Sequence, residues 1–350
     1  MPDSPELTKM KGWLQRALEL ELATIPPYMI SLLSIKLPGN REVAEILRGV
    51  MVEEMLHMVL VSNVLNAIGG KPRLDASAIP RYPFMLAFEG KQFIDRQFLV
   101  DLAPFSEGAV KTFMKIEQPR DADVREIDVQ RGVPALTIGE FYAAMVKLLE
   151  VIEAANPGRV FVGDEAKQFE ADYFWSGGGR IIRVKDLASA REALQLVAHQ
   201  GEGAPEGAQG RSGRVPTFHM GHFFRFKQIL HGRRYLEDDD PDRPPTGPKI
   251  TVDFNAVYPC KINPKSSDYP AGSVLAKLNN DFNIRYTALL RQLEDAMNGA
   301  PKALYDVTLD HMHALTPIAH EMMKLPLKDH PEGRTGCPTF ELSVPEGASS

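Results

Sequence analysis

The chain has 350 residues, which is enough for two domains of average size or for one large domain with long insertions. Hydrophobic residues form 44% of it and charged residues 25%, a composition that excludes collagen-like, coiled-coil and disordered chains. Its 40 lysines and arginines face 46 aspartates and glutamates, which leaves a net charge of −6. Because there is no basic excess to bind phosphates, neither nucleic acid nor an anionic membrane is an expected partner.

The sequence contains no recognisable targeting or membrane-spanning signal. Its first residues lack a basic segment followed by an apolar one, so we expect no secretory signal. Glu, His or Pro interrupts the longest apolar runs before they reach the roughly 18 residues of a membrane span. Cys260 and Cys337 are too few for a disulfide scaffold and lack CxxC spacing. We therefore expect a cytoplasmic protein.

Two long helices are predicted at the start of the chain. Apolar residues recur at helical spacing over residues 5–35 and again over 41–68. A short turn at 37–40 joins the two segments, and a glycine pair at 69–70 ends the second one. The two helices are therefore expected to form an antiparallel hairpin.

Pro26 and Pro27 lie inside the first predicted helix. Each proline removes a backbone donor, and its ring crowds the preceding turn. The helix should therefore kink near Ile25, unless other groups satisfy the carbonyls that the prolines free.

Two long insertions, over about 70–136 and 157–188, separate the remaining helices and are longer than the turns of a bundle. The further bundle helices are predicted over 137–155, 189–200 and 218–230. A glycine-rich stretch at 201–214 interrupts the last two. The expected division of the chain is a helical body over 1–235, a linker over 236–270, a C-terminal helical pair over 271–325 and a tail over 326–350.

Glu54 and His57 lie about 60° apart around the second helix and share a face with Val50 and Val61. A carboxylate in an apolar stripe is costly unless it is paired, neutralised or bound to a metal. Glu53 lies about 100° further round, where it is expected to reach solvent. Glu54 and His57 are therefore candidate metal ligands, although one ExxH pair alone is weak evidence.

The first helix offers a second inward carboxylate. Glu21 lies within about 40° of Leu14 and Ile25, whereas Glu19 points to the opposite side. Two inward glutamates and a histidine three residues after one of them form the half-site of carboxylate-bridged di-iron bundles.

A second half-site is expected from the later helices. The third helix offers Glu140, and the interrupted helix offers Glu202 before its gap and His222 after it. Gly201 and Gly203 allow a close backbone approach around Glu202. Oxygen and imidazole ligands favour iron or manganese over structural zinc, and iron is the first choice.

Two of these assignments have alternatives. Thr137 and Glu140 match a capping box, in which the glutamate reaches back to the threonine backbone, and Glu153 is then the substitute ligand. His222 taken alone is better explained as a core histidine, but Glu202 nearby and the other inward polar groups favour a ligand; His219 is a rival ligand one turn earlier.

The sequence resembles the ferritin-like domain of the iminophenyl-pyruvate dimer synthases, a family of violacein- and rebeccamycin-type pigment biosynthesis. The resemblance spans about 10–235 and lies in the blocks ELATIPPY (21–28), EEMLH (53–57), FMKIEQP (113–119), TIGEFY (137–142), QGEG (200–203) and HFFRF (222–226). It implies metal ligands at Glu21, Glu54, His57, Glu140, Glu202 and His222. Nothing matches the additional regions of those longer enzymes, so a stand-alone relative is expected and imine dimerisation is not carried over.

The expected fold is mainly α: a ferritin-like four-helix bundle with long insertions and a C-terminal helical extension. In that bundle Glu54 and Glu202 bridge two iron ions, Glu21 with His57 completes one position, and Glu140 with His222 completes the other. The expected function is the dioxygen-dependent oxidation of a small molecule, with manganese as the alternative metal. The rival hypotheses are a metal-binding protein without turnover and a degenerate scaffold that binds a partner or a small molecule.

Overall fold

The computed structural model describes residues 3–86, 98–118, 137–171, 179–202, 220–236, 238–328 and 330–343. This part of the chain is mainly helical, and its one sheet is an antiparallel hairpin of β1 (Phe84–Leu86) and β2 (Phe98–Val100). The mainly α fold expected from the sequence is confirmed.

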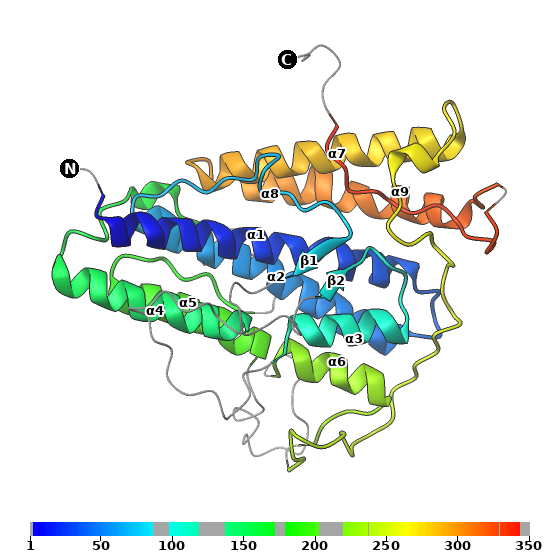
Figure 1. Cartoon of the computed structure of the whole chain (residues 1–350), viewed down its shortest axis with the longest axis horizontal. Helices are drawn as coiled ribbons and strands as arrows, with labels where there is room; N and C mark the ends of the chain where they lie inside the picture. Colours follow the sequence, from blue (N-terminus) through cyan, green and yellow to red (C-terminus); the bar gives the residue numbers. More distant parts are fainter. Residues whose placement is uncertain are drawn as a thin grey trace.

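The first two helices form the antiparallel hairpin that the apolar spacing predicts (Figure 1). They are α1 (Pro5–Ser34) and α2 (Arg41–Ala67). Helix α2 is the central one, since every residue from Leu56 to Ala67 is buried. Among the described residues it is the one helix long and apolar enough to cross a membrane, and 83% of that window is buried inside the protein.

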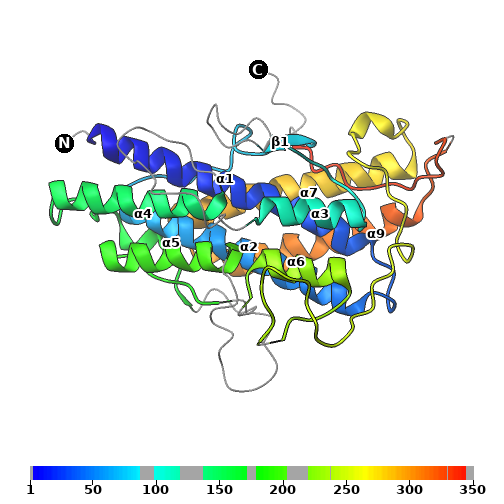
Figure 2. The same cartoon turned by 60° about the horizontal axis from the view of Figure 1, so that its bottom comes forward.

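Two helix pairs, placed end to end, complete the bundle around α1 and α2 (Figure 2). One pair is α4 (Ile138–Ala155) with α5 (Leu187–Glu202), and the other is α3 (Glu107–Ile116) with α6 (His222–His231). The two pairs pack against the hairpin in different apolar clusters. The ends of these four shorter helices therefore meet near the middle of α1 and α2.

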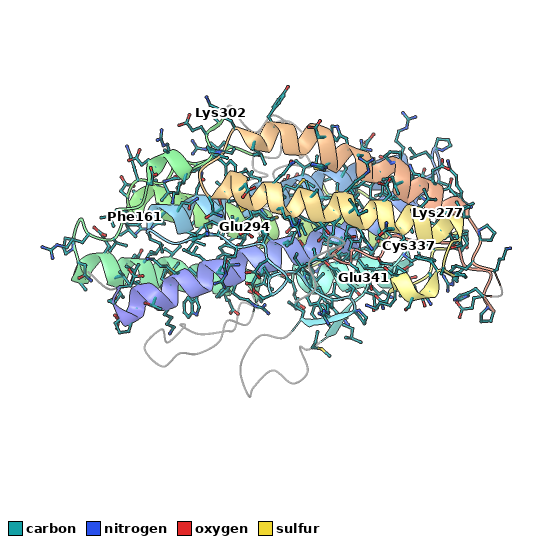
Figure 3. All side chains as sticks on the ribbon, turned by 90° about the horizontal axis from the view of Figure 1, so that it is seen from above. Phe161, Lys277, Glu294, Lys302, Cys337 and Glu341 are labelled. Atoms are coloured by element: carbon teal, nitrogen blue, oxygen red, sulfur yellow. The ribbon has the colours of Figure 1, made fainter. Side chains whose placement is uncertain are left out.

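The C-terminal helices pack on the other side of the hairpin (Figures 1 and 3). They are α7 (Val274–Met297), the short α8 (Ala303–Val307) and α9 (His313–Lys324). Buried residues of α7 and α9 belong to the same apolar cluster as those of α1 and α2. The Nδ2 of Asn66 in α2 also donates a 2.8 Å hydrogen bond to the carbonyl of Met297. The extension is therefore packed onto the bundle and shares its core.

Helix α1 continues through Pro26 and Pro27. Pro27 cannot donate to the carbonyl of Ala23, four residues earlier. The buried hydroxyl of Tyr82 donates a 2.8 Å hydrogen bond to that carbonyl. The first long insertion thus supplies a donor that the helix lacks, and it does so two residues from Glu21.

Tyr82→Phe is expected to lower the free energy of unfolding by about 1–3 kcal/mol, because it leaves a buried carbonyl without a partner. Tyr286→Phe is the matched control, since Tyr286 is also buried but its hydroxyl has no hydrogen-bond partner among the described residues. Urea unfolding of both variants checks the expectation. Equal losses in the two variants would show that the Tyr82 hydroxyl contributes nothing beyond packing.

Candidate metal centre

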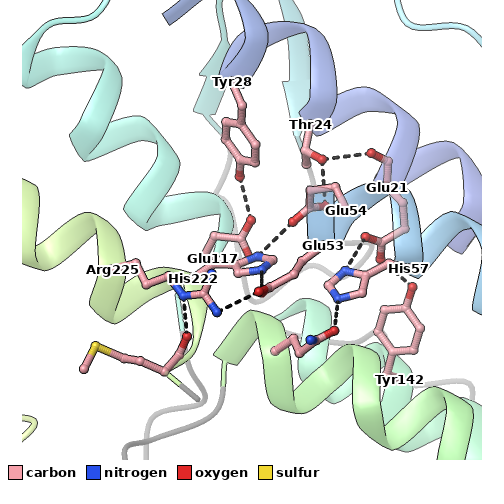
Figure 4. A network of polar contacts seen from close by, with 12 residues as sticks. Glu21, Thr24, Tyr28, Glu53, Glu54, His57, Glu117, Tyr142, His222 and Arg225 are labelled. Carbon is pink, nitrogen blue, oxygen red and sulfur yellow. Dashed lines mark hydrogen bonds and ion pairs between the residues drawn. The ribbon is translucent and has the colours of Figure 1, made fainter. Parts of the chain in front are cut away.

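Acidic side chains and imidazoles converge where α1 and α2 pass the meeting point of the four shorter helices (Figure 4). Glu21 comes from α1, and Glu54 and His57 come from α2. Glu117 is the C-cap residue of α3, and His222 is the first residue of α6. All five side chains are buried.

The first cluster, which we call the α1 half, consists of Glu21, Glu54 and His57, each able to offer one ligand atom to a common ion. The Nδ1 of His57 lies 3.1 Å from the Oε2 of Glu21. Burial alone would raise the pKa of Glu21, but His57 outweighs this effect and lowers it. The three side chains that the sequence predicts as a half-site therefore lie together in the structure.

The second cluster, which we call the α6 half, consists of Glu54, Glu117 and His222. The Nδ1 of His222 lies 2.8 Å from the Oε1 of Glu54 and 3.5 Å from the Oε2 of Glu117. It therefore faces a carboxylate oxygen of each of the two glutamates. A buried imidazole nitrogen that faces two carboxylate oxygens fits a metal ligand.

Glu54 belongs to both halves, as a carboxylate that bridges two ions must. Its Oε2 accepts a 2.8 Å hydrogen bond from the hydroxyl of Thr24. Burial, followed by the negative charges of Glu117 and Glu21, raises the pKa of Glu54 to about 8. A nearby cation would therefore stabilise the ionised form of the shared carboxylate.

Two buried tyrosines hold the outer carboxylates. Tyr142 of α4 donates to the Oε1 of Glu21, and Tyr28 of α1 donates to the Oε1 of Glu117 over 2.6 Å. Burial and the neighbouring carboxylates raise the pKa of both tyrosines, so both phenols remain protonated donors.

The outward orientation expected for Glu53 is wrong. Its side chain is 2% exposed, its Oε1 accepts a 2.9 Å hydrogen bond from the Nη2 of Arg225, and its Oε2 lies 2.9 Å from the Nε2 of His222. Burial alone would raise the pKa of Glu53, but His222 and Arg225 outweigh it and lower the pKa. Because α6 packs against this side of α2, the helix has no solvent face at Glu53.

The remaining predicted ligands lie outside both halves or outside the described part of the structure. Glu140 is buried in the first turn of α4 and belongs to neither half. The backbone nitrogen of Glu140 donates a hydrogen bond to the hydroxyl of Thr137, the N-cap residue of α4. Glu153 belongs to neither half, and its Oε1 accepts from the Gly158 nitrogen. The side chain of Glu202 and the whole of the rival ligand His219 fall outside the described residues.

Glu117 takes the place beside His222 that the sequence analysis gave to Glu140. It was missed because it lies one residue beyond α3, a short helix in the first insertion, where helical spacing gives no orientation. The signal that pointed to it was its position inside the block FMKIEQP.

The charge balance of the centre fits divalent cations. The four glutamates at positions 21, 53, 54 and 117 are each at most 4% exposed, and Arg225 is the one guanidinium that pairs with them among the described residues. Burying several carboxylates against one guanidinium and two imidazoles is unfavourable without further positive charge. A cavity of about 10 Å³, which borders Glu21, Glu54, His57 and Glu117, is on the order of one water molecule and suits an ion or a small ligand.

Comparisons with known proteins agree with this architecture. Residues 14–231 match the model of the ferritin-like family. Dichlorochromopyrrolate synthase of Lentzea aerocolonigenes is 27% identical over 333 aligned positions, which cover 85% of this chain and 29% of that protein. The crystal structure of a ferritin-like protein from Caulobacter vibrioides superposes with a TM-score of 0.63 at 24% identity, covering 98% of this chain and 99% of that one.

The resemblance inferred from the sequence blocks is therefore confirmed, although the chain spans less than a third of the pigment-pathway relative. The likeness to the solved structure supports the fold alone. The family model covers more than half of the chain and includes every residue of both halves. This chain belongs to the ferritin-like family.

Proposed function

We propose that this protein is a di-metal carboxylate oxidase, which binds two iron ions and uses dioxygen to oxidise a small molecule. The observation that carries the proposal is the sharing of Glu54 between two clusters that each offer two carboxylates and one imidazole. Two adjacent ion positions with a common carboxylate distinguish a di-metal centre from a single-ion site.

The donor set supports iron, with manganese as the alternative. Carboxylate oxygens and imidazole nitrogens suit these ions, whereas structural zinc prefers thiolates or a closed tetrahedral set. Both cysteines are buried in the apolar core, and neither belongs to the clusters. When bound, the iron pair would supply the redox chemistry toward dioxygen.

The protein's own residues would supply orientation and a dry environment. Tyr142 and Tyr28 hold the outer carboxylates by their hydroxyls, and Thr24 holds the shared one. Leu20, Ile138 and Val197 line the adjoining cavity with apolar groups, which would limit the access of water. The cavity is too small for an organic substrate, so the oxidised molecule would bind beside the centre.

The relatedness to a pigment-pathway enzyme favours an enzyme over a storage protein. The two long insertions point the same way, because storage needs compact bundles that pack into a cage. We further propose a cytoplasmic location, with a small molecule and no nucleic acid or membrane as partner. Imine dimerisation is not transferred, because the chain spans only 29% of that relative.

Loading of the purified protein with ferrous iron under anaerobic conditions is expected to leave about two ions per chain. Admission of air should then change the visible absorbance and consume dioxygen. Full iron content without dioxygen uptake would favour a binding protein without turnover. Less than about 0.2 iron or manganese per chain would favour a scaffold whose polar groups pair with one another.

A further inference from the structure

The two imidazoles of the centre are held by unlike partners. The Nε2 of His222 donates to the Oε2 of Glu53 over 2.9 Å, and the other oxygen of Glu53 is fixed by Arg225. The Nε of Arg225 is in turn fixed by the carbonyl of Met220 over 2.7 Å. A carboxylate behind a histidine sets its tautomer, so that Nδ1 faces the metal, and makes that nitrogen a more basic ligand.

His57 has a neutral partner in the corresponding place. Its Nε2 donates to the Oε1 of Gln200 over 3.0 Å, at the end of α5. An amide oxygen orients the ring as a carboxylate does, but it carries no charge and raises the basicity of the imidazole less. The hydrogen-bond partner behind His57 should therefore strengthen metal binding in the α1 half less than Glu53 does in the α6 half.

The contacts of the two ligand nitrogens are alike, whereas the two oxygens of the shared Glu54 differ. The Nδ1 of His57 lies 3.1 Å from the Oε2 of Glu21, and the Nδ1 of His222 lies 2.8 Å from the Oε1 of Glu54, so both nitrogens already contact a carboxylate oxygen. Thr24 occupies the Oε2 of Glu54, whereas the Oε1 of Glu54 faces His222.

We infer that the two halves bind metal unequally and in order: the α6 half of Glu54, Glu117 and His222 fills first, with Glu53 as its positioning residue. This inference rests on the proposed function. Removal of the partner behind a metal-bound histidine typically lowers affinity 10–100-fold, and we expect a difference of about that size between the two steps.

The test is a titration of the metal-free protein with Co²⁺, followed by equilibrium dialysis and by the visible absorbance of the bound ion. The wild type is expected to bind two ions in two resolved steps. Glu117→Gln should remove the tight step and keep the weak one, while Glu21→Gln should keep the tight step. These two variants assign each step to its half.

Glu53→Gln should weaken the tight step by about 10–100-fold, leave the weak step in place and alter the absorbance of the first ion bound. Glu19→Gln is the control, since Glu19 lies on the same hairpin, 18% exposed, and contacts Arg16 rather than the centre. If the substitution disrupted the fold, the affinities of both steps would fall together, and circular dichroism would show the loss of helix.

Two steps of equal affinity, loss of the tight step in Glu21→Gln, or an unchanged tight step in Glu53→Gln would each overturn the inference while leaving a di-metal centre in place. A wild type that takes up no ion would overturn the proposed function as well.

Discussion

Glu54→Ala is expected to empty the whole centre, lowering the iron content after anaerobic loading from about two ions per chain to below about 0.2. Both halves depend on this carboxylate, whereas any other ligand variant spares one half. His57→Ala should also reduce uptake, since it removes the only imidazole of the α1 half. Metal analysis of the dialysed proteins provides the measurement.

Glu19→Ala is the matched control for this experiment. Glu19 lies two residues before Glu21 on the same helix, but it contacts Gln15 and Arg16 at the surface. Its iron content should equal that of the wild type. Glu53→Ala is unsuitable as a second control, because Glu53 is buried against His222. Two ions retained in Glu54→Ala would contradict the shared-ligand arrangement.

Helical spacing was sufficient to predict the hairpin and the half-site within it. Glu21, Glu54 and His57 lie among apolar residues at intervals of three and four, so only their type sets them apart from the core. The helix expected over 137–155 is present as Ile138–Ala155. Local periodicity was sufficient to predict the orientation of residues that lie within one long helix.

The rest of the centre depends on how separate segments meet, which periodicity does not encode. Glu53 was placed outward because one apolar stripe was assumed, whereas α6 covers a second side of α2. Glu117 lies beyond a helix end, so its orientation comes from the packing of α3 against α6. Glu140 has the right chemistry and burial, but it belongs to neither half.

The metal-free protein is expected to lose stability as the pH rises from about 5 to 8. The folded state holds Glu54 protonated up to a pKa of about 8, against 4.5 for an ordinary glutamate. Between these values the folded state binds more protons than the unfolded one, so each rise in pH favours unfolding. The loss is on the order of a few kcal/mol, since one pKa unit corresponds to about 1.4 kcal/mol.

The other buried groups either lower the free energy of unfolding in the same direction as the pH rises or titrate outside the range from about pH 5 to 8. Burial alone would lower the pKa of His57 and His222, but the surrounding carboxylates outweigh it and raise both, so their stabilisation is also lost as the pH rises above 6.5. The lowered pKa values of Glu21 and Glu53 matter only near and below 4.5.

Glu54→Gln isolates the contribution of the shared carboxylate. The variant cannot ionise at this position, so its free energy of unfolding should exceed that of the metal-free wild type at pH 8 and approach it near pH 5. Chemical denaturation at several pH values in the presence of a chelator provides the measurement.

A metal ion takes the place of the proton on Glu54, so the loaded wild type should gain stability over the range in which the metal-free protein loses it. Parallel pH profiles for the metal-free wild type and Glu54→Gln would mean that the buried carboxylate carries no such penalty, and the electrostatic argument for cations at this centre would then fail.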